Sequence, residues 1–576
     1  MSVAARREVL RGALALGGGA ALSSLFPAWA QSAARGLPTL PTLTGEDIKL
    51  TIGHTRVMID GKSQHAVTIN GTVPGPLLRL REGQRARISV TNTLDEESSI
   101  HWHGLLVPFQ MDGVPGVSFP GIDPGETFTY EFPVVQSGTY WYHSHSGMQE
   151  AMGHFGPIII DPAGEDPVAY DREHVLMLSD WSFIHPHHLM MRLKQSPGYF
   201  NRQKQTVAGL LQGKDQSLAD RLSWAGMLMD PTDISDVTGS VYRYLVNGRG
   251  TEENWTGLFR PGERVRLRII NASAMTNFNF RIPGLAMTVV QVDGQHVRPV
   301  EIDELQIAIA ETYDVIVQPT EDIAYGIVGE ALDRSGLVRA TLAPRAGMTG
   351  PVPSLRERPL LNMRDMGMDM AMPAVLDLSQ PEGGAVMDHG SMKMRDGANA
   401  PQVTLNPGVA TISPMPADRV GDIPTGLESA GHRVLRYTDL QSLTPNRDTR
   451  PHTRSIDLHL TANMERYMWS IDGEKLSERT EPIAFRHMER VRINLINDTM
   501  MPHPIHFHGH FFELVNGHDG NRPLKHTVNV LPGGKLTIDL TADALGDWAM
   551  HCHMMFHMDL GMFRIVTVRH DVEGAA

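Results

Sequence analysis

REGQRARISVTN, residues Arg81–Asn92, is a segment that this chain of 576 residues carries in three versions. The other two are RPGERVRLRIIN at Arg260–Asn271 and RHMERVRINLIN at Arg486–Asn497. All three keep Arg at positions 1, 5 and 7, an amide or acid at position 4, and Asn at the end. Their second halves alternate charged and apolar residues, the period of two that is typical of a half-buried strand. Three copies of one strand–turn unit predict three homologous β-sandwich domains.

The composition favours many short strands and turns. Aromatic residues make up 6% of the chain, whereas Gly and Pro number 55 and 38, a balance that favours strands over long helices. We expect the three domains at residues 45–165, 166–346 and 431–576. Residues 347–430 are rich in Pro, Gly and Met, which predicts a Met-rich linker or insertion before the third domain.

Residues 1–30 are predicted to be a signal peptide of the twin-arginine type. Arg6 and Arg7 precede a mild, Gly-rich apolar run, and Ala28-Trp29-Ala30 offers a cleavage site. The run is too short to span a bilayer, and we expect no other membrane span. The predicted location is therefore the bacterial periplasm, reached through the twin-arginine export machinery.

Charge and cysteine content restrict the partners and the chemistry. The formal net charge of −14 argues against nucleic acid as a partner. Cys552 is the only cysteine, so the chain has no internal disulfide. In an oxidising compartment a lone thiol is a liability unless it is buried or committed to chemistry. Cys552 is therefore a candidate functional residue.

The three repeats differ in their histidines. Positions 6, 9 and 11 after the closing Asn are Ser98, His101 and His103 in the first copy, Asn277, Phe280 and Ile282 in the second, and His503, His506 and His508 in the third. A second alignment sets Ser144, Gln149 and His154 of the first domain against Cys552, His557 and Met562 of the third. The first domain is thus expected to have lost a site that the third domain keeps.

Four short motifs carry closely spaced histidines: HWHG from His101, HSH from His143, HPIHFHGH from His503 and HCHMMFHMDLGM from His551. Residues i and i+2 of a strand project from the same face, so each His-x-His pair can present two imidazoles to one pocket. Four pairs supply eight nitrogens, enough for three metal ions. Zinc is a poor alternative, because a structural zinc site closes on four ligands.

Cys552 lies between His551 and His553 and would face the opposite side of a strand. It can then join His503, His557 and a long axial contact from Met562. Two histidines, one cysteine and a weak methionine are characteristic of a blue copper site. Two covalently bonded neighbours would thus link a one-electron entry site to a site with several metals.

These four motifs closely resemble the copper motifs of three-domain multicopper oxidases, over essentially the whole chain after residue 30. The resemblance implies an all-β fold of three cupredoxin-like Greek-key domains and four copper ions, one of type 1, one of type 2 and two of type 3. It also implies electron transfer from type 1 copper to the other three, where O₂ is reduced to two waters. The implied ligands are His503, Cys552, His557 and Met562 for type 1, His101 and His506 for type 2, and His103, His143, His145, His508, His551 and His553 for type 3.

Asp112, nine residues after His103, resembles an acidic residue that family members place beside the cluster to deliver protons. A plain turn role for Asp112-Gly113 is the alternative.

Methionines in the low-complexity stretch indicate the substrate. Thioethers select Cu(I), and the interleaved Asp, Gly, Lys and Arg show no helical period, which argues against a packed core. With the export signal, they resemble the copper-resistance protein A branch of the family, which implies oxidation of Cu(I) to Cu(II). The candidate Cu(I) ligands are Met363, Met366, Met368, Met370, Met372, Met387, His389, Met392 and Met394.

Three alternatives stay open. A laccase-like oxidase of small phenols would have the same copper ligands and no need of the methionines. A copper store or carrier would use the methionines and have no need of a multi-copper cluster. The methionines could also be incidental residues of a flexible linker.

Overall fold

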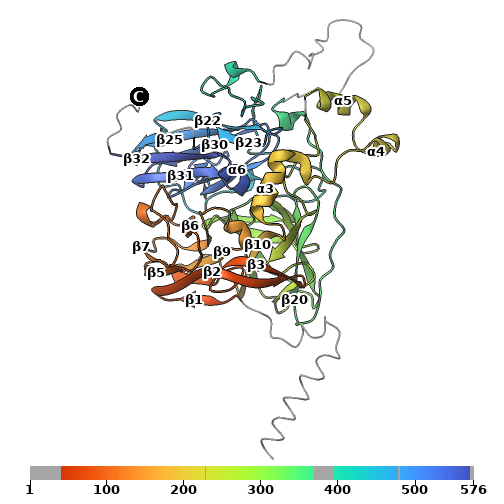
Figure 1. Cartoon of the computed structure of the whole chain (residues 1–576). Coiled ribbons are helices and arrows are strands. Elements are labelled where there is room, and N and C mark those ends of the chain that lie inside the picture. The colour runs from red at the N-terminus through yellow and green to blue at the C-terminus, as the bar shows by residue number, and fades with distance from the viewer. Residues whose placement is uncertain (1–39, 228, 369–394, 478–480, 571–576) are drawn as a thin grey trace, which may run out of the picture.

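Six β-sheets make up the core of the computed structural model, which describes residues 40–227, 229–368, 395–477 and 481–570. The sheets form three consecutive pairs along the chain, coloured red to orange, green and blue in Figure 1, and the pairs pack against one another. The predicted all-β fold of three sandwiches is therefore confirmed. No helix of the described ranges is long and apolar enough to cross a membrane. The predicted signal peptide lies outside these ranges.

The first pair consists of a four-stranded sheet, in the order β3-β2-β5-β7, and a five-stranded sheet, in the order β1-β4-β9-β8-β6. Its strands are β1 (Thr42–Thr44), β2 (Asp47–Ile59), β3 (Lys62–Ile69), β4 (Leu77–Arg81), β5 (Arg85–Asn92), β6 (His101–His103), β7 (Thr127–Pro133), β8 (Gly138–His143) and β9 (Phe155–Asp161). Short 3-10 helices η1 (Phe109–Met111) and η2 (Glu150–Met152) lie in its loops.

The second pair has sheets in the orders β11-β10-β13-β18-β15-β16 and β12-β20-β19-β14-β17. Its strands are β10 (Arg172–Ser182), β11 (Tyr242–Val246), β12 (Trp255–Leu258), β13 (Val265–Asn271), β14 (Phe278–Arg281), β15 (Met287–Val292), β16 (Gln295–Ile302), β17 (Glu304–Ile307), β18 (Thr312–Val317), β19 (Tyr325–Ala331) and β20 (Leu337–Ala343). Between β10 and β11 the chain forms α3 (Pro186–Gln195), η3 (Pro197–Tyr199), α4 (Val207–Leu211) and α5 (Leu218–Gly226).

The third pair has sheets in the orders β23-β22-β25-β30-β27-β28 and β24-β32-β31-β26-β29, with β21 added beside β30. Its strands are β21 (Ala417–Asp418), β22 (Arg454–Asn463), β23 (Met468–Ile471), β24 (Ile483–Arg486), β25 (Arg490–Asn497), β26 (His503–Phe507), β27 (Phe512–Leu514), β28 (Leu524–Lys525), β29 (Thr527–Val530), β30 (Gly534–Thr541), β31 (Gly546–Cys552) and β32 (Phe563–Arg569). Its helical turns are η4 (Met363–Met366), η6 (Gly397–Asn399), η7 (Tyr437–Asp439) and α6 (Met555–Asp559).

The closing Asn of each sequence repeat has the same role in all three pairs of sheets. Asn92, Asn271 and Asn497 are fully buried at the ends of β5, β13 and β25. Each side-chain amide donates to two backbone carbonyls, one of them 30 to 36 residues further along the chain. Each side-chain oxygen accepts from the backbone N–H two residues on. The Asn therefore fixes the loop that leads into the next strand, which carries the residue nine positions after it: His101, Phe280 or His506.

Position 4 of the repeat closes the preceding turn. Gln84 accepts a bond from the backbone N–H of position 1 at 2.8 Å, Glu263 does so at 2.8 Å, and Glu489 at 2.9 Å. Position 3 has a positive φ in all three copies, with Gly in two of them and Met488 in the third. These shared bonds explain why an amide or acid recurs at position 4.

The described part of residues 347–430 packs against both the second and the third pair of sheets, and Arg356 pairs with Glu304 and Glu330 of the second. Strand β21 pairs with β30 in parallel, and the backbone N–H of Ala410 donates to the carbonyl of Ala462 at 2.8 Å. Met366 and Met368 are buried in a small apolar cluster that also contains Trp224 and Met500. The expectation that no methionine of this stretch packs in a core is therefore wrong for Met366 and Met368, because tertiary contacts bury them without any local periodicity.

Candidate metal centre

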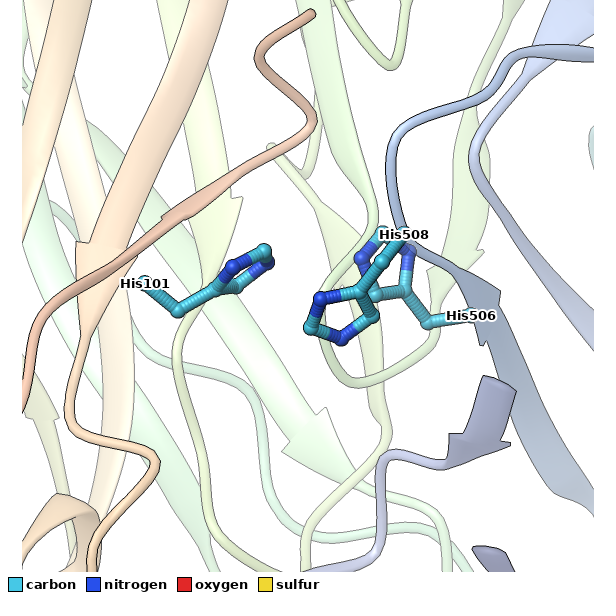
Figure 2. A group of neighbouring side chains, drawn as sticks. All are labelled: His101, His506 and His508. Atoms are coloured by element: carbon cyan, nitrogen blue, oxygen red, sulfur yellow. The ribbon is translucent and has the colours of Figure 1, made fainter. Parts of the chain in front are cut away.

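Eight histidines meet between the first and third pairs of sheets. Strands β6 and β8 pair so that His101 lies opposite His143, and β26 and β31 pair so that His506 lies opposite His551. Figure 2 shows His101, on the first pair of sheets, pointing across the boundary toward His506 and His508 of the third. The complete set is His101, His103, His143, His145, His506, His508, His551 and His553, all of them buried except His145, which is partly exposed.

Six of these histidines divide into two groups of three. One nitrogen each of His103, His143 and His553 lies within 4.8 Å of the others, and the same holds for His145, His508 and His551. Each group draws on both the first and the third pair of sheets. The remaining two, His101 and His506, have ring centroids 5.8 Å apart and form a group with His508. This division into triplets could not be read from the sequence.

The hydrogen bonds of the imidazoles orient their free nitrogens inward. Nδ1 of His101 bonds the Asp112 carbonyl at 2.7 Å, Nδ1 of His506 bonds the His526 carbonyl at 2.7 Å, and Nδ1 of His143 lies 2.8 Å from the Glu150 carboxylate. Nδ1 therefore carries the proton, and Nε2 keeps its lone pair. Buried Nε2 atoms that lack a hydrogen-bond partner within the described ranges occur in His101, His103, His143, His145, His506 and His553. Uncompensated buried nitrogens are costly, and a group of them fits bound metal ions.

Burial favours the neutral imidazole in His103, His143, His506 and His551. It lowers the pKa of His103, His143 and His506 well below the ordinary value, and nearby histidines lower it further. The same burial lowers the pKa of His551 to about 4. A neutral imidazole has the lone pair that metal coordination requires.

Cys552 forms a separate group with His503 and His557. Its Sγ lies 3.5 Å from Nδ1 of His503 and 3.9 Å from Nδ1 of His557, and the two Nδ1 atoms are 3.3 Å apart. Burial raises the pKa of the Cys552 thiol. Met562 is fully buried; its backbone N–H donates to the His557 carbonyl at 2.9 Å and its carbonyl accepts from the Cys552 N–H at 3.1 Å. All four predicted type 1 residues therefore meet in one region.

Cys552 faces one side of the strand segment that ends β31, and its two neighbours, His551 and His553, face the other side. His551 belongs to one triplet and His553 to the other, whereas Cys552 belongs to the group with His503. The alternation of side chains along a strand produces this arrangement.

The first pair of sheets contains a counterpart of the Cys552 group without its metal-binding chemistry. The N–H of Ser144 donates to the His154 carbonyl at 3.1 Å, as that of Cys552 does to Met562. Ser98 and Ser144 both donate to the side-chain oxygen of Gln149, at 2.7 and 3.0 Å. A hydrogen-bonded network of neutral side chains therefore occupies this position.

Asp112 contacts histidines from both pairs of sheets. Its Oδ2 lies 2.8 Å from Nδ1 of His508, and its carbonyl accepts from His101. The side chain is buried, and no described residue forms a hydrogen bond with its Oδ1. Gly113 has a φ of +85°, and a Cβ at that residue would lie 1.8 Å from the Ile100 carbonyl oxygen. Only Gly therefore lets the chain bring Asp112 this close to β6.

Three residues around the Cys552 group were not identified from the sequence. Thr499 Oγ1 lies 2.7 Å from Nε2 of His503, and Asp236 Oδ2 lies 2.7 Å from Nε2 of His557. Trp469 stacks on the His557 ring with centroids 3.5 Å apart. Thr499 precedes the HPIHFHGH motif by four residues, which is a weak signal. Asp236 comes from the segment between α5 and β11 and has no sequence signal of its own.

A buried ion-pair network holds the backbone beside His506. Lys525 Nζ lies 2.9 Å from Asp293 Oδ2 and 3.1 Å from Glu311 Oε1, and all three side chains are buried. Asp293 Oδ2 also accepts from the backbone N–H groups of His526 and Thr527 at 3.2 and 3.3 Å. Through this contact the second pair of sheets, which contributes none of the eight histidines, supports the carbonyl that orients His506.

A cavity of about 440 Å³ lies beside the Cys552 group. Thr499 forms part of its wall and bonds His503, as described above. Burial raises the pKa of Asp233, a second wall residue, to about 8, and its Oδ1 has no hydrogen-bond partner in the part of the chain that the structure describes. The wall also contains the thioethers of Met227, Met229, Met464 and Met500 and the charged side chains of Asp230, Glu465 and Lys204.

Of the predicted Cu(I) ligands, Met363, Met366 and Met368 lie in the described part of the chain. Met363 is partly buried against the apolar cluster of Met366 and Met368, which also includes the cavity residues Met227, Met229, Met464 and Met500. Met370, Met372, Met387, His389, Met392 and Met394 lie outside the described residues.

Comparison with known proteins agrees with this geometry. Three family models, each described as multicopper oxidase, match residues 51–165, 172–343 and 449–572. Copper resistance protein A of Escherichia coli is 47% identical over 98% of this chain and 99% of its own length. Copper resistance protein A of Pseudomonas syringae pv. tomato is 46% identical over 98% of this chain and 99% of its own length. The laccase structure from Botrytis aclada, 22% identical, superposes with a TM-score of 0.62 over 94% of this chain and 89% of its own. That likeness concerns the fold of three cupredoxin-like domains.

Proposed function

Because this chain belongs to the multicopper oxidase family, we propose that it oxidises Cu(I) to Cu(II) and uses the electrons to reduce O₂ to water. Copper cofactors and oxidase activity follow from the family. The identity of the substrate, the number of coppers and the role of each residue are our proposals. The domain limits 45–165, 166–346 and 431–576, with 347–430 as the insertion, are proposed with them, because the family models match within the three domains.

The proposed type 1 ligands are His503, Cys552, His557 and Met562. They are supported by the approach of one sulfur and two Nδ1 atoms, all within 3.9 Å of one another. Thr499 and Asp236 bond the outer nitrogens of the two histidines, which holds each Nδ1 toward the sulfur. Stacking of Trp469 on His557 excludes water from that side.

The other three proposed coppers are held by the eight histidines at the domain boundary. We assign His101 and His506 to type 2, and the triplets His103, His143, His553 and His145, His508, His551 to the two type 3 ions. When bound, these ions supply the four-electron reduction of O₂. The two neighbours of Cys552 belong to different triplets, so one strand segment connects the type 1 residues to both. Asp112, buried and bonded to His508, is the proposed proton donor.

The observation that carries the Cu(I) proposal is the cavity beside His503. Met227, Met229, Met464 and Met500 offer thioethers, which are soft donors that prefer Cu(I). Oδ1 of Asp233 has no hydrogen-bond partner among the described residues, and burial raises the pKa of Asp233 although the charge of Lys204 opposes the shift. A further cation would stabilise this carboxylate. A Cu(I) ion in this cavity would be separated from the type 1 ligand His503 only by the Thr499 wall.

The test compares Cu(I) with a phenol as electron donors. We expect Met464→Leu/Met500→Leu to lower kcat/KM for Cu(I) about tenfold, which corresponds to about 1.4 kcal/mol of transition-state stabilisation. The kcat/KM for 2,6-dimethoxyphenol should stay within about twofold. Met58→Leu, in the exposed part of β2, is the matched control. An equal loss of kcat/KM for Cu(I) and the phenol would indicate that the methionines support the structure of the type 1 site. A loss for the phenol alone would favour a laccase-like oxidase.

We also propose that the enzyme acts in the periplasm after twin-arginine export. Arg6, Arg7 and the A-x-A site support this location. In the periplasm, Cu(I) oxidation would lower copper toxicity.

A further inference from the structure

Three exposed histidines outside the sites above stand at the start of α3. His185 is the N-cap residue and accepts a hydrogen bond through Nδ1 from the N–H of His187 at 3.3 Å. Its ring centroid lies 5.3 Å from that of His187 and 6.1 Å from that of His188. The first of these separations is close to the 5.6 Å between His103 and His143, which share a candidate copper position. Nδ1 of His185 therefore has the lone pair, and a bound ion would replace its 3.3 Å bond to the His187 N–H. Solvent exposure lets the other two rings turn toward that ion.

An acidic side chain of the first domain lies near these histidines. Burial lowers the pKa of His185, as do His187 and His188, while the negative charge of Glu96 raises it. Glu96 belongs to the first domain, whereas α3 lies in the segment between β10 and β11 of the second.

We propose that His185, His187 and His188 bind Cu(II) at the surface, with Glu96 adding negative charge. The inference rests on the proposed function, because Cu(II) is the product of Cu(I) oxidation. Imidazole nitrogens suit Cu(II), which binds such donors more tightly than the other divalent first-row ions do. Thioethers suit Cu(I). When the copper ion loses one electron to the type 1 site, its preferred ligands therefore change from the methionines of the cavity to these histidines. The histidines give the product a binding site at the surface.

The binding test uses the resting, copper-loaded full-length enzyme without a purification tag. Equilibrium dialysis against Cu(II) should give one additional ion per chain beyond those of the untreated enzyme. That ion should have an electron paramagnetic resonance spectrum with nitrogen hyperfine structure. His187→Gln/His188→Gln should weaken its binding at least tenfold and leave the blue absorption unchanged. His54→Gln/His65→Gln, two exposed histidines of β2 and β3, is the matched control and should bind Cu(II) as the parent does.

Absence of an additional Cu(II), or equal binding by the double variant and its control, would overturn the proposal. So would tighter binding of Zn(II) than of Cu(II). The dialysis involves no turnover, so its result does not depend on whether Cu(I) is the substrate. Failure of the Cu(I) proposal would instead appear in the kinetics of the Met464→Leu/Met500→Leu variant.

Discussion

Asp112 Oδ2 and His508 Nδ1 lie 2.8 Å apart although 396 residues separate them in the sequence. The same Asp112 accepts the Nδ1 hydrogen of His101 through its backbone carbonyl at 2.7 Å. One residue of the first domain therefore orients an imidazole of its own domain and one of the third. A role for Asp112 in a turn alone would leave the contact of its side chain with His508 unexplained.

Asp112→Asn should slow O₂ reduction and leave the type 1 site intact. The backbone bond to His101 survives this substitution, whereas His508 loses a carboxylate partner and the cluster loses a proton donor. We expect kcat to fall about 10²-fold, within the range typical of a lost general acid, with unchanged blue absorption. Oxygen consumption and visible spectra provide the measurement. Asp123→Asn, at an exposed loop position, is the control; a normal rate in Asp112→Asn would exclude the relay.

Cys552→Ser should abolish the blue absorption and all turnover without unfolding the third domain. The first domain already holds Ser144 at the equivalent position, with the same backbone bond to the residue ten positions later. Serine therefore fits the strand geometry but supplies no thiolate for copper. Absorption near 600 nm, copper content and circular dichroism distinguish loss of the site from loss of the fold. Blue colour in this variant would contradict the type 1 assignment.

Asp293→Asn should loosen the backbone beside His506. It leaves the buried Lys525 with one carboxylate partner among the described residues, Glu311, and disruption of a buried ion pair typically costs about 3–5 kcal/mol. We expect a lower temperature of the first unfolding transition and partial loss of type 2 copper, measured by calorimetry and electron paramagnetic resonance. The type 1 absorption should persist because Asp293 contacts none of its ligands. Simultaneous loss of both signals would indicate general unfolding instead.

Replacing residues 370–394 with a Gly/Ser segment of equal length should weaken the use of Cu(I) alone. The exchange removes Met370, Met372, Met387, His389, Met392 and Met394 and spares the buried Met366 and Met368. It also spares Asp365, which pairs with Arg419 at 2.7 Å. If these residues gather Cu(I), its KM should rise about tenfold while phenol oxidation is unchanged. An unchanged KM would leave them as linker residues.

Arg6→Lys/Arg7→Lys should retain the full-length precursor in the cytoplasm, because the twin-arginine pair is the feature the export machinery reads. Fractionation followed by mass spectrometry gives the result. A mature periplasmic form beginning near Gln31 in this variant would contradict the route.

The sequence by itself determined the three sandwiches and the sets of histidines. Both depend on short-range geometry: the alternation of β5, β13 and β25, the local bonds of Asn92, Asn271 and Asn497, and the shared face of residues two apart on a strand. These features repeat, so the copies could be compared with one another. The comparison also identified Ser144 as the counterpart of Cys552.

Only the tertiary structure decided which histidines share a triplet and what surrounds the Cys552 group. Asp236 reaches His557 across 321 residues, and Asp293 supports His526 across 233. Neither aspartate lies in a motif, because its role depends on how separate sandwiches pack and not on its neighbours in the chain. The cavity methionines are likewise dispersed between Met227 and Met500. Packing brings them together, and the same packing buries Met366 and Met368, whose surroundings in the sequence suggested exposure.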